Sequence, residues 1–164
     1  MTYRRQLQSL VLAVVWTFAC GGSTSSSGSA APSAEPTPQG TVTQTDTGCT
    51  LTGVAGPMKP GYVSLNAVNQ TSALAGFDMW RITEPNTYQD LVAYVAKEKD
   101  LAAAGQGGLG HPSFVSDLIS AQVLPSKTGT LYGSVRQGTY AIVCLGPTGA
   151  GTRPLALVGP IQVQ

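Results

Sequence analysis

The residues that could carry chemistry in this chain are few. The 164 residues include three cysteines, Cys20, Cys49 and Cys144, and one histidine, His111, with 9 basic and 8 acidic side chains. Cysteine can carry a lipid, form a disulfide or bind a metal as the thiolate, whereas a single histidine excludes a multi-histidine metal cluster. We therefore expect no bound metal or other cofactor.

Catalytic arrangements find little support. A Ser-His-acid arrangement would have to use His111, and the sequence contains no Gly-x-Ser-x-Gly elbow. A paired-carboxylate mechanism could draw on five acids, Asp78, Glu84, Asp90, Asp100 and Asp117. Asp90 is explained more simply as a helix cap, and Glu84 and Asp100 as solvent-facing residues beside turns. The sequence therefore favours a protein that is not an enzyme.

The N-terminus carries a targeting signal. A start with two arginines and no acid precedes the mostly apolar residues 7–19, a pattern typical of a secretory signal and too short for a transmembrane helix. The segment ends in Ala-Cys-Gly-Gly, which resembles the lipobox of bacterial lipoprotein precursors, although Thr17 replaces the usual aliphatic residue. The resemblance implies a signal peptide over residues 1–19 and a lipid such as palmitate on Cys20. The alternative is an ordinary secretory signal that leaves Cys20 free.

Residues 20–40 are rich in Ser, Gly and Pro, so they cannot bury a core and are expected to form a flexible, disordered tether. Such a tether would hold a folded domain away from the membrane to which the lipid attaches it. We expect an extracytoplasmic protein of the cell membrane or outer membrane, periplasmic or on the cell surface. The formal net charge of +1 lacks the basic excess of a nucleic-acid-binding protein.

With Cys20 acylated, Cys49 and Cys144 remain as a pair in an oxidising compartment. A disulfide between them would close about 95 residues and contribute about 4–5 kcal/mol in the chain-entropy model. We favour this disulfide over two buried free thiols and over Cys144 as a metal ligand.

Residues 41–164 consist mostly of short β-type runs separated by Gly and Pro. Strands are expected over residues 41–45, 49–54, 62–69, 77–83, 130–136, 139–145 and 155–163. Alternation in 62–69 predicts one buried face, whereas 139–145 is apolar on both faces and is expected to be central.

One helix interrupts the strands. Thr87 and Asp90 fit a capping box, apolar residues follow at helical spacing, and Gly105 is expected to end the helix. The charged residues 97–100 are expected on a solvated face of it. Residues 114–124 could form either a helix or a strand.

Three motifs resemble those of cupredoxin-like domains. Residues 59–66, followed by Asn69, resemble the Pro-Gly, strand and Asn opening of that family, and residues 76–82 resemble its next strand. Residues 136–144 are similar to the strand with Gly-Thr-Tyr that delivers the copper cysteine. The resemblance implies an all-β fold over residues 41–164, a Greek-key cupredoxin-like β-sandwich with one inserted α-helix.

The copper chemistry of that family is not expected. A type 1 copper site uses two histidines, a thiolate and usually a methionine. The resemblance places the first histidine near Ala75 or Gly76, and the second with the methionine after Cys144, yet residues 145–164 contain neither His nor Met. The resemblance therefore implies the fold and not the activity.

Two further residues are candidates for binding. Trp80 is expected in the core, although an exposed position would suggest ligand or partner binding. His111 follows the glycine-rich residues 105–110 and is expected to be a solvated or locally hydrogen-bonded loop residue. The glycines follow a helix rather than a strand, so they predict a flexible hinge or loop and not a phosphate cradle.

The sequence thus predicts a lipid-anchored extracytoplasmic module without copper redox activity. It would bind a small ligand or another envelope protein, or play a structural role. The alternative is an accessory metal-handling protein with an incomplete copper site built from Met58, Met79 and His111.

Overall fold

The structure, a computed structural model, describes residues 36–149 and 151–164. The predicted signal peptide, the lipid on Cys20 and residues 20–35 of the predicted tether lie outside the described residues. Within them the elements are β1 (Thr41–Thr45), β2 (Gly48–Thr52), β3 (Gly61–Asn69), β4 (Ala75–Ile82), α1 (Tyr88–Ala103), β5 (Val115–Val123), β6 (Thr128–Val135), β7 (Gly138–Thr148) and β8 (Gly151–Val163).

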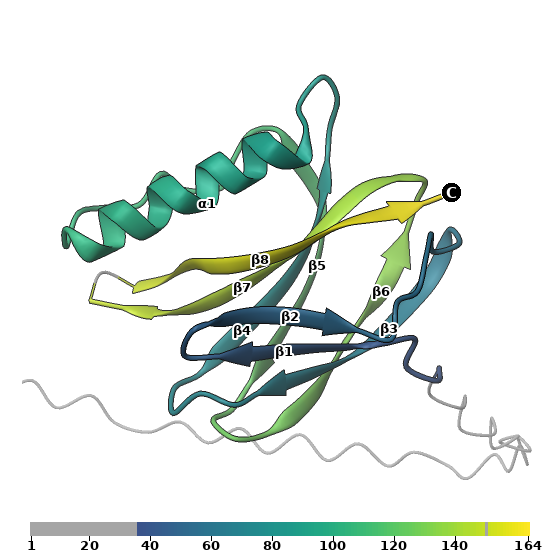
Figure 1. Cartoon of the computed structure of the whole chain (residues 1–164), viewed down its shortest axis with the longest axis horizontal. Coiled ribbons are helices and arrows are strands. Elements are labelled where there is room, and N and C mark those ends of the chain that lie inside the picture. Colours follow the sequence, from purple (N-terminus) through teal and green to yellow (C-terminus); the bar gives the residue numbers. More distant parts are fainter. Residues whose placement is uncertain (1–35, 150) are drawn as a thin grey trace, which may run out of the picture. The chain divides into compact units, whose positions relative to one another are not determined.

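The strands form two four-stranded sheets, ordered β2-β1-β3-β6 and β5-β4-β7-β8 (Figure 1). β1 and β3 run parallel, whereas the other strand pairs are antiparallel. β7 lies between β4 and β8, which confirms the central position predicted for it. The expected β-sandwich with a helix inserted among the strands is confirmed, and the ambiguous segment 114–124 forms the strand β5.

The two faces of the second sheet contribute to different hydrophobic clusters. The inner face meets the first sheet in a core that includes Leu65, Phe77 and Tyr140. The outer face and α1 enclose a second cluster that includes Trp80 and Leu91. Successive strand residues point to opposite faces, so β4 and β7 contribute to both clusters. The apolar run of residues 140–145 in β7 follows from this double burial.

Helix α1 lies along β7 and β8 on the outer side of the second sheet (Figure 1). Its predicted capping box is present: the Thr87 hydroxyl accepts from the Asp90 amide, and the Asp90 carboxylate accepts from the Thr87 amide at 2.7 Å. Gly105 follows the C-cap with φ +67°, a conformation that glycine adopts without strain. The predicted start and end of the helix are confirmed. α1 is not long and apolar enough to cross a membrane. No other helix within residues 36–149 and 151–164 has the length and apolarity to do so.

The end of the predicted tether is bonded to β3. The Gln39 amide donates to the Ser64 carbonyl at 2.7 Å, and the Gly40 carbonyl accepts from the Asn66 amide at 2.9 Å. A Cβ added at Gly40 would lie 2.7 Å from the Thr52 carbonyl oxygen, so only glycine lets these backbones approach so closely.

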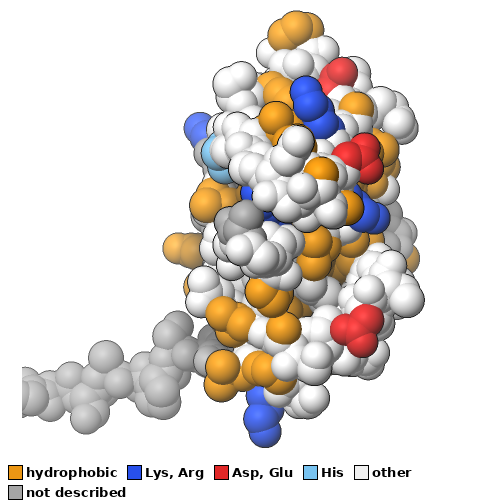
Figure 2. Space-filling model, turned by 90° about the vertical axis from the view of Figure 1, so that its left-hand side faces the viewer, with side chains coloured by type: hydrophobic (Ala, Val, Ile, Leu, Met, Phe, Trp, Pro, Cys, Tyr) orange, Lys and Arg blue, Asp and Glu red, His pale blue; other side chains and the backbone are white. Residues whose placement is uncertain are grey.

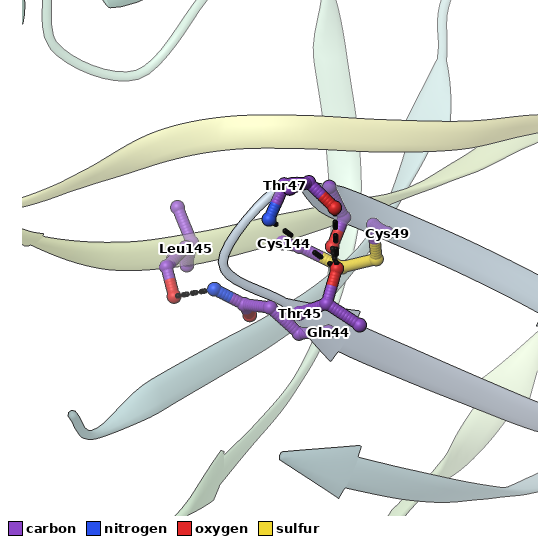
Figure 3. The surroundings of a disulfide bond; sticks show 7 residues. Gln44, Thr45, Thr47, Cys49, Cys144 and Leu145 are labelled. Atoms are coloured by element: carbon purple, nitrogen blue, oxygen red, sulfur yellow. Dashed lines mark hydrogen bonds between the residues drawn. A yellow bond between two sulfur atoms is a disulfide. The ribbon is translucent and has the colours of Figure 1, made fainter. Parts of the chain in front are cut away.

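The predicted disulfide is confirmed. Cys49 of β2 and Cys144 of β7 are joined across the sandwich, with their Cα atoms 6.3 Å apart and a sequence separation of 95. Figure 3 shows this bond beside Gln44, whose side-chain amide donates to the Leu145 carbonyl at 3.2 Å. A covalent link and a hydrogen bond therefore connect the two sheets at the same place.

Candidate functional site

Trp80 and His111, two residues singled out separately from the sequence, lie together on the outer side of the second sheet. Their ring centroids are 5.1 Å apart. Tyr94 of α1 lies 6.5 Å from the Trp80 ring, and Phe114 packs edge-on against Tyr94 at 6.4 Å. Trp80 is 4% exposed, which confirms its expected core position, whereas His111 is exposed as predicted.

Glu98 does not lie on a solvated helix face, so the prediction for residues 97–100 is wrong at this position. It is 2% exposed and faces Arg153 of β8, which is 5% exposed, with Oε2 and Nη1 3.6 Å apart. Glu98 lies two turns after Leu91 and one after Val95, on the buried stripe of α1. A glutamate on that apolar stripe was the sequence signal that could have revealed it.

The buried pair holds the backbone of the glycine loop, which we define as residues 105–111. Glu98 Oε1 accepts from the Leu109 amide at 2.5 Å. Arg153 Nη2 donates to the Gln106 carbonyl. These bonds explain the burial, because the loop folds back over the end of α1 and covers both charges.

Tyr94, which lies one helical turn before Glu98 on α1, is hydrogen-bonded to the same loop. Its hydroxyl donates to the Gly110 carbonyl and lies 3.1 Å from Glu98 Oε1. Burial, followed by the hydrogen bond and the negative charge of Glu98, raises the pKa of Tyr94. The hydroxyl therefore keeps its proton and acts as a donor.

A pocket of about 370 Å³ opens between the glycine loop, α1 and β8, and Trp80, Tyr94, Glu98, His111 and Arg153 all line it. Two buried atoms of the ion pair, Glu98 Oε2 and Arg153 Nη1, have no hydrogen-bond partner in the described part of the chain and face each other at 3.6 Å. Buried polar groups are nearly always hydrogen-bonded, so two such atoms in the lining of one pocket mark it as a candidate binding site.

Asp78 adds an acidic group beside the pocket. It lies two residues before Trp80 on β4, opposite Ser120 of β5. Burial raises the pKa of the Asp78 carboxyl, and hydrogen bonds with the Ser120 and Trp80 side chains and the charge of His111 oppose this rise. The Asp78 carboxyl therefore accounts for the polar edge of the Trp80 ring.

The other pockets described here have fewer features of a binding site. One of about 740 Å³ lies beside the disulfide, and one of about 970 Å³ lies between the start of α1 and the C-terminus. Neither is lined by a buried polar atom that lacks a partner within residues 36–149 and 151–164. Gln44 Oε1 is such an atom beside a separate hollow of about 300 Å³, but its amide nitrogen is bonded to Leu145.

The residues proposed for an incomplete copper site are not brought together. Met58 and Met79 lie in the core between the sheets, whereas His111 packs at a tilt against Trp80 on the opposite face of the second sheet. Cys144 is engaged in the disulfide. Among the residues that the structure describes, no group of three or more His, Cys, Asp or Glu side chains could hold a metal ion.

Aromatic side chains also gather on the first sheet. Tyr62 of β3 and Tyr132 of β6 stack with centroids 5.6 Å apart and planes 9° from parallel, and both are exposed. Nothing in the structure indicates what would cover the tyrosine pair.

Figure 2 views the domain from the end at which α1 finishes. This face carries hydrophobic and uncharged polar groups with only scattered charges.

No family model matches the chain, and no curated protein matches its sequence. A solved structure of auracyanin B is similar to it, with a TM-score of 0.40 and 16% sequence identity over 76% of this chain and 86% of that chain. A likeness of this size carries no statement about ligand or activity. Function must therefore be inferred from the residues of the site.

Proposed function

We propose that this chain is an extracytoplasmic binding module, held at a membrane by a lipid on Cys20, that takes a small ligand in the pocket under the glycine loop. The disulfide supports the compartment, because such bonds persist where conditions are oxidising. The proposal includes neither copper redox chemistry nor catalysis.

One observation carries the proposal: Glu98 and Arg153 line one pocket as a buried ion pair, and the facing atoms Glu98 Oε2 and Arg153 Nη1, 3.6 Å apart, lack hydrogen-bond partners in the described chain. Leaving a buried polar atom unpaired costs about 1–3 kcal/mol, and more for a charged group. A ligand that pairs these atoms would recover this free energy on binding.

Binding suits the site better than acid-base catalysis. Glu98 Oε1 accepts from the Leu109 amide and lies within hydrogen-bonding distance of the Tyr94 hydroxyl. These bonds hold the carboxylate in one position. It is thus held as a stationary acceptor for a ligand.

A fragment screen by ligand-observed NMR tests the binding function. It uses the full chain in phosphatidylcholine vesicles and two glycine variants. A Cβ at Gly108 would lie 3.1 Å from Glu98 Oε2 and 3.4 Å from Arg153 Cζ, whereas one at Gly107 meets nothing within 4 Å. We expect fragments that bind the wild-type chain and the Gly107→Ala variant and are lost in the Gly108→Ala variant. A screen without any such fragment would overturn the proposed function.

Metabolic labelling with radioactive palmitate tests the membrane anchor. We expect label on the wild-type chain and on the Cys49→Ala variant, but none on the Cys20→Ala variant. An unlabelled wild-type chain would remove the lipid from the proposal while leaving the pocket untouched.

A further inference from the structure

We infer that the ligand is an uncharged, polyhydroxylated molecule such as a sugar or another polyol, an inference that rests on the proposed binding function. Its basis is the chemistry of the two facing atoms of the ion pair that lack a hydrogen bond. Glu98 Oε2 can only accept a hydrogen bond, whereas Arg153 Nη1 can only donate. The ligand must therefore supply both donors and acceptors.

The spacing of the ion pair suits a hydroxyl group. Glu98 Oε2 and Arg153 Nη1 are 3.6 Å apart, beyond the usual range of a direct hydrogen bond. An oxygen placed about 2.8 Å from both atoms would close this gap with normal distances. A hydroxyl can donate to the carboxylate and accept from the guanidinium through that one atom.

Charge disfavours ligands that carry a single net charge. Glu98 and Arg153 form a neutral pair in a buried place. A ligand ammonium would satisfy the carboxylate but approach the guanidinium, and a ligand carboxylate would do the reverse. Either ligand would add an uncompensated charge to a poorly solvated site, which costs more than binding a neutral group.

The pocket also has an aromatic wall, to which Trp80 contributes its ring. The aromatic rings of Tyr94 and His111 also line the pocket and offer apolar surface to the C–H groups of a sugar. A volume of about 370 Å³ lies within the range of small-molecule sites.

Sugars that share one ring and differ in charge test this inference. Glucose, glucosamine with a protonated amine, and glucuronate are titrated into the full chain in phosphatidylcholine vesicles, with galactose, N-acetylglucosamine and mannitol as further neutral probes. Saturation-transfer NMR measures binding. We expect at least one neutral probe to bind at least tenfold more tightly than both charged sugars, and to lose at least tenfold in affinity in the Gly108→Ala variant but not in Gly107→Ala.

Tighter binding of either charged sugar at the pocket would overturn the ligand class and leave the binding function standing. The same conclusion follows if fragments bind there but every sugar fails, because water would then suffice to bridge the pair. If neither fragments nor sugars bind, both proposals fail. The Arg153→Met variant provides a second check, because the remaining carboxylate should shift the preference from glucose toward glucosamine.

Discussion

Glu98 and Arg153 face each other at 3.6 Å, and each also holds the backbone of the loop that covers it. The pair therefore connects three parts of the fold: α1, β8 and the glycine loop. Its burial depends on the loop, and the position of the loop depends on the pair. This mutual dependence makes the region sensitive to the loss of either charge.

Removing one charge is expected to cost more than removing both. The Glu98→Gln variant or the Arg153→Met variant should lower the free energy of unfolding by about 3–5 kcal/mol, because the other charge stays buried without its partner. The Glu98→Gln/Arg153→Met double variant should lose clearly less than the sum. Urea unfolding of all four proteins measures the coupling, and additive losses would contradict it.

Reduction of the disulfide is expected to destabilise the domain strongly. Cys49 and Cys144 close a loop of 95 residues, for which the chain-entropy model predicts about 4–5 kcal/mol. Urea unfolding with and without a reducing agent measures this difference. The Cys49→Ala/Cys144→Ala variant is the control, because its stability should not respond to the reducing agent.

Asp78 is expected to lower stability at neutral pH. Burial raises its pKa above the unfolded value near 3.8, so folding disfavours the charged form. Its unfavourable contribution is present above the raised pKa and disappears as the pH falls through it, because the folded protein then binds the proton more tightly. The Asp78→Asn variant should therefore be more stable than wild type at pH 7. The difference in stability between the two proteins should become smaller at about pH 3.5.

Urea midpoints at the two pH values measure this effect. The matched control is Asp46→Asn, since Asp46 is exposed in the turn between β1 and β2. If the urea midpoints of Asp78→Asn and wild type differ by the same amount at both pH values, Asp78 does not have a raised pKa in the folded protein.

Gly40 is expected to tolerate no side chain. A Cβ there would lie 2.7 Å from the Thr52 carbonyl oxygen, and backbone cannot move aside as a side-chain end can. The Gly40→Ala variant should lose about 1–3 kcal/mol of stability through overpacking. The Gly48→Ala variant serves as its control, because a Cβ at that position meets nothing within 4 Å. Equal melting temperatures of the two variants would contradict this prediction, because the backbone around Gly40 and Thr52 would then have moved apart at no cost in stability.

The strand and helix pattern of residues 41–164 could be predicted because it is encoded locally. Alternation predicted the buried face of β3, two apolar faces predicted the central β7, and Thr87 with Gly105 marked the ends of α1. The strand expected over residues 49–54 ends earlier, at Thr52, where Gly53 turns the chain with φ +85°.

The disulfide was within reach of the sequence, because two cysteines in an oxidising compartment have few alternatives. The candidate site was not. Trp80, Glu98, His111 and Arg153 lie far apart in the chain, and local patterning cannot show which distant residues meet. A glutamate among lysines looks solvated until a loop folds over it. Its burial was therefore decided by the tertiary structure, in which the glycine loop returns across the end of α1 and places Arg153 opposite Glu98.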